Sequence, residues 1–173
     1  MQTKNDEEDK VIDCINCITG KTEVVIFKGG KVLRITEMGT KENDLAFIGP
    51  GLTDLQINGI NGIDFNTTSL TEQDFADATH YLLSWGVTTF LPTDVTNPDE
   101  NILTIVHTIY EACRSNSFVD KYVWGIHLEG PFILPAEGAK RAHDKKYIKA
   151  PDWDLFNKFQ EAVIINGKIV LEN

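Results

Sequence analysis

GLTDLQIN at residues 51–58, VTTFLPT at 87–93 and YVWGIHLE at 122–129 decide the fold. Each is a short stretch typical of a β-strand, and the three begin near positions 52, 87 and 122, with 35 residues from each start to the next. Stretches with helical periodicity fill the intervals. Strands that alternate with helices at this spacing predict an α/β fold with three successive βα units in a parallel sheet.

Start signals for helices follow each of these strands. Ser69 and Glu72 have the spacing of a capping box, and Gly86 is placed to end that helix. Asn97 precedes Pro98, which suits an N-cap residue followed by proline in the first turn. The segment PDWDLFNKFQEA at 151–162 predicts a further capped helix.

The two ends of the chain have a different texture. TEVVIFKGGKVLRITEM at 22–38 has two β-rich runs around Gly29-Gly30, which is a hairpin signal, and AVIINGKIVLEN at 162–173 repeats the pattern. We therefore expect residues 1–48 together with 163–173 to form a small β domain, and residues 49–162 to form the α/β domain.

Charge and composition exclude some classes of partner. The 173 residues carry a net charge of −10, which argues against nucleic acid or an anionic membrane as a partner. The first ten residues lack an apolar signal core and no run approaches ~20 apolar residues, so we expect a cytoplasmic protein. Three cysteines fit a reducing compartment, with redox or metal use of the C-x-x-C at 14–17 as the alternative.

Polar residues gather where the predicted strands end. Gln56 and Asn58 close the first strand, Asp94 follows the second, and His127 and Glu129 close the third. Carboxyl ends of parallel strands carry the functional sites of such folds, and residues two apart on a strand share a face. A buried carboxylate must be balanced, here by a metal, an arginine or a substrate cation.

Structural readings remain open beside the functional ones. His127 could be a hydrogen-bonded core histidine, Gln56 and Asn58 could bond backbone groups, and Asp94 could be a loop hydrogen-bond acceptor. His143 lies in a basic stretch of this acidic chain, which is either a solvated loop or a rim that attracts anions. The basic residues of that stretch are Lys140, Arg141, Lys145 and Lys146.

Four segments together resemble the N-acetylglucosamine-6-phosphate deacetylases of the amidohydrolase superfamily. They are GPGLTDLQINGINGIDFN at 49–66, TTFLPTDVTN at 88–97, GIHLEGPFI at 125–133 and RAHDKKYIKAPD at 141–152. The resemblance implies a partial (β/α)₈ TIM barrel with a small β-sandwich piece from both chain ends. It also implies removal of acetate from N-acetylglucosamine 6-phosphate to give glucosamine 6-phosphate, and a homodimer for the full-length proteins.

The resemblance also assigns roles to residues. Glu129 matches the glutamate that binds one divalent metal ion, expected to be Zn²⁺, which would activate water and polarise the acetamide carbonyl. Ala142 and His143 match a segment that contacts substrate. Gln56 and Asn58 occupy the place of the H-x-H pair of most amidohydrolases, which favours one metal ion rather than two.

The sequence departs from the family after the third βα unit. The family's two histidine ligands and its catalytic aspartate lie on later strands, and the chain passes directly from residue 162 to the terminal β-rich segment, so we expect the catalytic residue beyond this chain. The alternative to a deacetylase is a catalytically incomplete remnant or sugar-phosphate-binding module. A dihydroorotase-like amidohydrolase is disfavoured because such enzymes use H-x-H where this chain has Gln56 and Asn58.

Overall fold

The chain folds into two compact units, residues 1–50 and residues 51–173. A computed structural model describes residues 9–39, 44–134 and 143–162, together with the backbone of 170–172. Each unit is built around its own sheet. None of the described helices is both long and apolar enough to cross a membrane.

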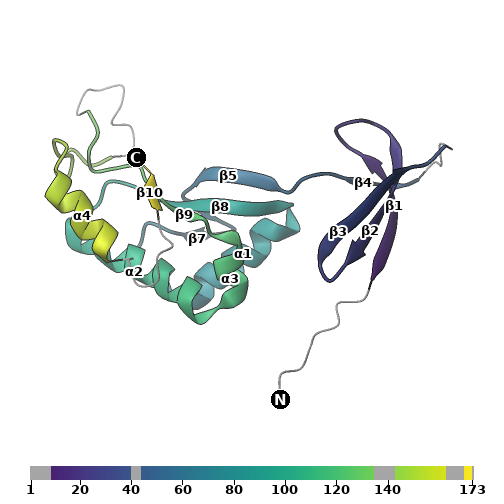
Figure 1. Cartoon of the computed structure of the whole chain (residues 1–173). Helices are drawn as coiled ribbons and strands as arrows, with labels where there is room; N and C mark the ends of the chain where they lie inside the picture. The colour runs from purple at the N-terminus through teal and green to yellow at the C-terminus, as the bar shows by residue number, and fades with distance from the viewer. Residues whose placement is uncertain (1–8, 40–43, 135–142, 163–169, 173) are drawn as a thin grey trace, which may run out of the picture. The chain divides into compact units, whose positions relative to one another are not determined.

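The first unit is a four-stranded sheet in the order β3-β2-β1-β4 (Figure 1). Its strands are β1 (Lys10–Asn16), β2 (Thr22–Lys28), β3 (Lys31–Glu37) and β4 (Ala46–Ile48). β1, β2 and β3 are antiparallel neighbours, and β4 runs parallel to β1. Gly29 and Gly30 join β2 to β3 with φ values of 55° and 72°. Two positive φ angles in a two-residue loop match a type I′ turn, so the predicted hairpin is confirmed.

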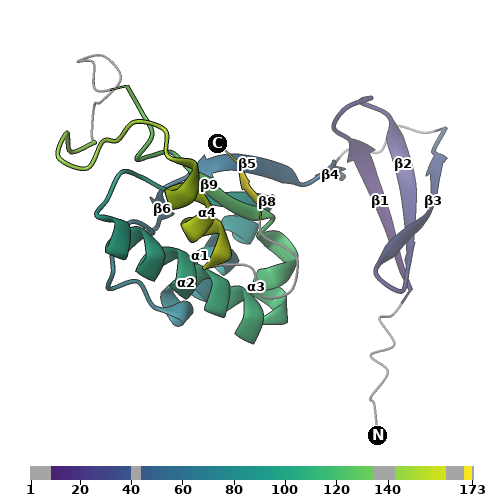
Figure 2. The ribbon, with the colours of Figure 1, turned by 60° about the vertical axis from the view of Figure 1, so that its left-hand side comes forward.

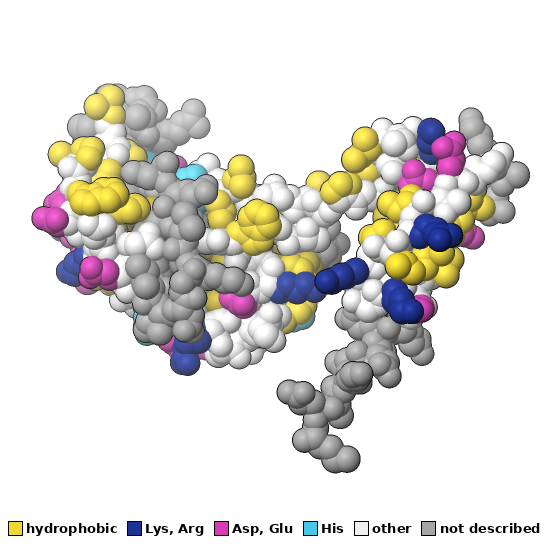
Figure 3. Space-filling view, in the orientation of Figure 1, with side chains coloured by type: hydrophobic (Ala, Val, Ile, Leu, Met, Phe, Trp, Pro, Cys, Tyr) yellow, Lys and Arg dark blue, Asp and Glu magenta, His cyan; other side chains and the backbone are white. Residues whose placement is uncertain are grey.

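Burial in this first sheet is confined to a few positions. Cys14 and Val25 are almost fully buried, whereas β3 is exposed along its whole length. Hydrophobic side chains therefore reach the surface of this unit (Figure 3). The exposed apolar residues are Val11, Ile12, Ile18, Val32, Leu33, Ile35 and Phe47.

The second unit contains the predicted parallel sheet. Its strands are β5 (Leu52–Ile57), β8 (Val87–Asp94), β9 (Gly125–Leu128) and β10 (Val170–Glu172), in the order β10-β9-β8-β5. All neighbours are parallel. The predicted side-by-side order of the first three strands is confirmed. Two short strands, β6 (Gly59–Ile60) and β7 (Ile63–Asp64), form a separate antiparallel pair in the loop after β5.

Helices cover one face of this sheet (Figures 1 and 2). α1 (Glu72–Ser84), α2 (Asp99–Ser115) and α3 (Ser117–Tyr122) pack against β8 and against one another, and α4 (Trp153–Glu161) packs on α2. The largest fully buried side chains of the core between them are Phe65, Phe75, Phe90, Phe159, Ile102, Ile105, Ile109, Ile126 and Leu128. Burial of apolar surface on this scale is the main stabilising term of the unit.

Three predicted element starts are wrong by one to three residues. The N-cap of α2 is Pro98 rather than Asn97, and no side chain caps that helix. α1 is capped by Thr71, whose hydroxyl accepts from Asp74 N while the Asp74 carboxylate accepts from Thr71 N. Ser69 does not cap the helix because its hydroxyl bonds Thr67, and buried Leu70 stands between it and the first turn. The third strand begins at Gly125 rather than at residue 122, since the helix α3, capped by Asn116, extends to Tyr122.

The carboxy-terminal segment lies in a different place from the one predicted. The sequence pattern predicts residues 163–173 in the small β unit, but Val170–Glu172 pairs in parallel with β9, Val170 opposite Gly125 and Glu172 opposite His127. The prediction is wrong for these three residues, and residues 163–169 lie outside the described part. The outer edge of β9 offers unpaired backbone groups that any β-forming segment can satisfy, so apolar alternation alone does not choose the sheet.

Asn66 fastens the long loop after β5 to the end of β8. Its side-chain Oδ1 accepts from Val95 N at 2.6 Å, and its Nδ2 donates to the carbonyls of Thr93 at 3.1 Å and Asn58 at 3.3 Å. Asn97 in turn donates to the Asn66 carbonyl at 3.3 Å. One side chain thus satisfies backbone groups of two βα loops, which fixes the carboxyl edge of the sheet.

We expect Asn66→Ala to lower the free energy of unfolding of this unit by about 1–3 kcal/mol, because it leaves partly buried backbone groups without their hydrogen-bond partner. Asn66→Asp should cost less, since a carboxylate can still accept from Val95 N. Urea unfolding followed by tryptophan fluorescence reports on this unit alone, because all three tryptophans (Trp85, Trp124 and Trp153) lie in it.

Asn101→Ala is the control, since that side chain makes one recorded bond, to Asn97. Equal effects of the two alanine variants would show that Asn66 does not join the two loops.

Candidate active site

Glu129 is the centre of a polar cluster at the carboxyl ends of the parallel strands. It follows β9, and its backbone N–H donates to the Asp94 carbonyl at 2.9 Å, which extends the pairing of β9 with β8 by one residue. Its carboxylate accepts from Gln56 Nε2 at 3.0 Å through Oε2, and Oε1 lies 3.3 Å from Nε2 of His143. The Glu129 side chain is 31% exposed, so it is accessible from solvent.

His143 enters the cluster from a distant loop. Its side chain is only 7% exposed, and Nδ1 lies 2.9 Å from the Thr96 hydroxyl. Both ring nitrogens therefore have a partner. Thr96 is itself buried, in the loop after β8. The structure thus brings together three of the predicted site residues, Gln56, Glu129 and His143.

His127 and Asn58 do not join this cluster through recorded contacts. His127 Nδ1 lies 3.0 Å from the Leu55 carbonyl, so the ring reaches across β8 and ties β9 to β5. The ring is thus hydrogen-bonded, but it is half-buried rather than part of the core. Asn58 is exposed, and its backbone carbonyl accepts from Phe65 N at 2.9 Å. Ala142 lies outside the described residues.

Asp94 is in an environment that the sequence does not reveal. It ends β8 and is 1% exposed, yet neither carboxylate oxygen has a hydrogen-bond partner among the described residues. The prediction that it serves as a loop hydrogen-bond acceptor is therefore wrong within the described part of the chain. Burial raises the pKa of Asp94 to about 8, because desolvation disfavours the charged form.

The cluster does not by itself make a complete metal site. No group of three or more His, Cys, Asp and Glu side chains within residues 9–39, 44–134 and 143–162 is placed to hold an ion. Glu129 and His143 supply one carboxylate and one imidazole, whereas a catalytic zinc takes three protein ligands and keeps one open position. Among these residues the expected zinc site is thus incomplete.

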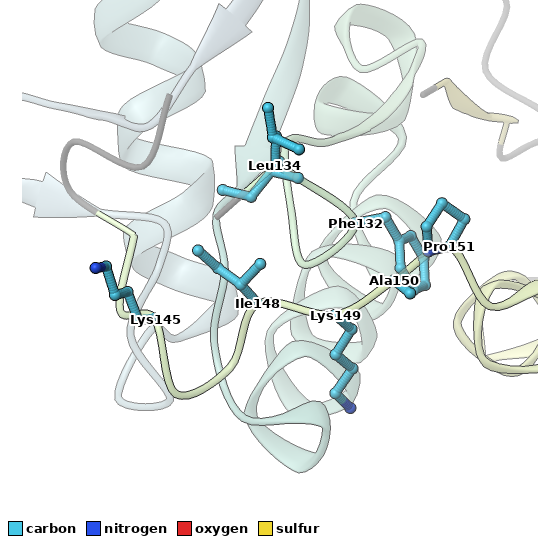
Figure 4. A pocket seen from close by; sticks show the side chains of 8 residues that line it. Phe132, Leu134, Lys145, Ile148, Lys149, Ala150 and Pro151 are labelled. Atoms are coloured by element: carbon cyan, nitrogen blue, oxygen red, sulfur yellow. The ribbon is translucent and has the colours of Figure 1, made fainter. Parts of the chain in front are cut away.

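A cavity of about 510 Å³ lies along the segments that flank the cluster in sequence. In Figure 4, Leu134, Ile148 and Phe132 surround it, and the ammonium groups of Lys145 and Lys149 point away from Ile148. Lys149 pairs with Asp99 at the start of α2, and its backbone N–H donates to the Pro131 carbonyl. The full lining is Phe132, Ile133, Leu134, Lys145, Ile148, Lys149, Ala150 and Pro151.

Comparison with known proteins places these features in a family context. No family profile matches the chain. N-acetylglucosamine-6-phosphate deacetylase of Mus musculus is 32% identical over 140 residues, which covers 75% of this chain and 33% of the mouse protein. The human enzyme is also 32% identical, over 139 residues. The chain thus spans about a third of the length of these relatives.

Solved structures agree in fold. The crystal structure of N-acetylglucosamine-6-phosphate deacetylase from Thermotoga maritima matches with a TM-score of 0.72 and 25% identity, covering 86% of this chain and 39% of that one. A mutant of the Mycobacterium smegmatis enzyme, in complex with N-acetyl-D-glucosamine-6-phosphate, matches with a TM-score of 0.71 and 21% identity. This match covers 94% of the present chain and 42% of the Mycobacterium smegmatis chain.

Asp94 makes stability depend on pH. A carboxyl group whose folded pKa lies above its unfolded value of ~3.9 holds a proton in the folded state that the unfolded chain releases, so the free energy of unfolding falls as pH rises from about 4 to about 8. We expect Asp94→Asn to remove this fall and to be more stable than the wild type by a few kcal/mol near pH 8, on the order of what such a shift implies.

Urea midpoints measured from pH 4 to 8.5 test this, with Asp77→Asn on the exposed face of α1 as the control. A wild type whose stability is flat or rises over this range, with Asp94→Asn changing nothing, would contradict it.

Proposed function

Because this chain is homologous to N-acetylglucosamine-6-phosphate deacetylases over about three quarters of its length, we propose that it serves the deacetylation of N-acetylglucosamine 6-phosphate. The observation that carries the proposal is the cluster of Gln56, Glu129 and His143. These residues lie far apart in sequence and meet at the carboxyl edge of a parallel sheet. That edge is where folds of this kind hold their active sites.

The parallel sheet is, in this proposal, an arc of a (β/α)₈ barrel. β5, β8 and β9 follow one another in space as in sequence, with helices on one face, and the similarity in fold to a solved deacetylase supports this proposal. A closed barrel has eight strands. The described residues provide four parallel strands, of which β10 occupies the position that a fourth consecutive barrel strand would take beside β9.

Each residue of the cluster has a chemical role in the proposal. Glu129 supplies one ligand to a single divalent ion, Zn²⁺ in the proposal, and when bound that ion would polarise the acetamide and activate water. Gln56 orients the Glu129 carboxylate through its amide donor. His143 places Nε2 beside the same carboxylate, where it can contact the substrate. Asp94 does not take the role of the catalytic aspartate in this proposal, since its side chain is buried away from solvent.

Basic residues near His143 suit the phosphate of the substrate. Lys145 and Lys146 are exposed within a few residues of His143, in a chain whose net charge is −10. A local positive field is what an anionic sugar phosphate requires when the whole molecule is acidic. We propose that this stretch acts as an anion-attracting rim.

A second function is favoured by one specific observation. The described residues hold no group of three potential metal ligands, so they favour a sugar-phosphate-binding module without turnover. The two functions share the same ligand and the same cluster. They differ only in whether acetate is released.

Metal binding tests the role of Glu129. We expect the 173-residue chain to bind at most one equivalent of Zn²⁺ at micromolar protein, and Glu129→Gln to weaken that binding at least tenfold, because the amide loses the charge that attracts the ion. Equilibrium dialysis with elemental analysis measures both. Glu161→Gln at the end of α4 is the control, and two equivalents retained in Glu129→Gln would overturn the assignment.

Ligand binding and turnover separate the two functions. We expect the 173-residue chain to bind N-acetylglucosamine 6-phosphate more tightly than N-acetylglucosamine, because the phosphate meets the basic rim, and to release acetate at less than about 1 s⁻¹, the lower end of ordinary enzymes. Calorimetry and an acetate assay with added Zn²⁺ measure these.

Turnover above that rate, lost in Glu129→Gln, would show that the described residues are sufficient for catalysis and that the chain is an enzyme by itself. Failure to distinguish the phosphorylated sugar from the free sugar would overturn the proposed substrate.

A further inference from the structure

The His143 ring is held between two oxygen groups with different hydrogen-bonding abilities, since a carboxylate only accepts whereas a hydroxyl can donate or accept. Nε2 lies 3.3 Å from Oε1 of Glu129, and Nδ1 lies 2.9 Å from the Thr96 hydroxyl. The His143 side chain is 7% exposed, so water does not readily replace either partner. The protonation of the ring nitrogens is therefore determined by what these two neighbours can donate and accept.

The two neighbours allow one arrangement of protons in the neutral ring. A carboxylate accepts and cannot donate, so the proton must be on Nε2 for the ring to bond Glu129. Nδ1 then carries the lone pair, and the Thr96 hydroxyl must donate to it. A serine or threonine hydroxyl has one hydrogen, so Thr96 uses its only donor on His143.

We propose that Thr96 is a positioning residue for His143: its hydroxyl donates to Nδ1 and keeps the ring turned so that Nε2–H points at Glu129. In this state His143 directs a donor, not a lone pair, into the cluster. It thus binds oxygen atoms rather than a metal ion. On the proposed function, Nε2–H leaves Glu129 and donates instead to an oxygen of the sugar phosphate when the ligand is bound.

Packing around Thr96 leaves it little freedom to move. A Cβ at Gly130 would lie 2.0 Å from the Thr96 hydroxyl oxygen and 2.8 Å from its backbone nitrogen. The chain next to Glu129 thus lies directly on Thr96, without a side chain between them. The backbone N–H of Glu129 also donates to the Asp94 carbonyl. The Thr96 hydroxyl and the Glu129 carboxylate are therefore held at fixed positions, with the His143 ring between them.

Ring-nitrogen NMR of the ligand-free chain tests the inference directly. In ¹⁵N-histidine-labelled protein at about pH 8.5, where an ordinary imidazole is neutral, we expect His143 as the Nε2–H tautomer with Nδ1 shifted as a hydrogen-bonded acceptor. His143→Gln assigns the signals. Thr96→Val should move the Nδ1 resonance toward that of an unbonded ring nitrogen, whereas Thr96→Ser should restore the wild-type shift.

Two internal controls keep the experiment decisive. Thr104→Val removes an exposed hydroxyl on α2 and should leave His143 unchanged. His127, which bonds the Leu55 carbonyl, should keep its signals in every variant and so shows that the sheet remains folded. A wild-type Nδ1–H tautomer, or a Thr96→Val spectrum identical to the wild type, would overturn the inference.

Ligand affinity provides a second, separate test of the role of Thr96. We expect Thr96→Val to weaken N-acetylglucosamine 6-phosphate binding about 2- to 10-fold, the range of one hydrogen bond, with Thr96→Ser near the wild type. Because the NMR measurement needs no ligand, absence of binding by the wild type would contradict the proposed substrate and leave the role of Thr96 to be decided by the ring signals. Unchanged affinity in Thr96→Val with an altered ring would limit Thr96 to the ligand-free state and overturn its part in binding.

Discussion

The parallel register of β8 against β9 is the constraint on which the candidate site depends. Thr93 pairs with His127 and Asp94 with Leu128, and the next backbone bond, from Glu129 N to the Asp94 carbonyl, brings both strand ends to the same level. A shift of one residue would reverse which side chains face the core. The loops after these strands then start from fixed points, so Thr96 and Gly130 come into contact and His143 finds a place above them.

Alternation and strand polarity are the features of the fold that can be predicted from the sequence. β-rich runs spaced by helical stretches indicate the parallel order of β5, β8 and β9, because such connections have few alternatives. Strand polarity also predicts that Gln56 and Glu129 lie at one edge, and the two side chains, 73 residues apart, are hydrogen-bonded. Charge alone singles out the basic stretch around His143. It does not place His143 beside Glu129, since no periodicity connects its loop to the sheet.

Competition between local partners decides the features that the sequence does not predict. Ser69 and Thr71 are both acceptable caps, and the hydroxyl of Thr67 decides between them by bonding Ser69. Val170–Glu172 belongs to a β-rich run that predicts a hairpin strand, yet it pairs in parallel with the free edge of β9. Thr96 has no sequence signal at all. Only the absence of a side chain at Gly130, a position that resembles an ordinary Gly-Pro turn, hints that something packs closely there.

Asp94 and Glu129 lie at the same sheet edge but in different electrostatic environments. They end neighbouring strands, but Glu129 has polar partners and solvent access, whereas Asp94 has neither among the described residues. Desolvation raises the pKa of Asp94 to about 8, so at neutral pH that carboxyl group is mainly protonated and adds little negative charge to the edge. Negative charge at these two strand ends is therefore concentrated on Glu129, the residue with donors arranged around it. A cation or a polar ligand drawn to this edge meets one carboxylate in a defined orientation, rather than two that repel each other.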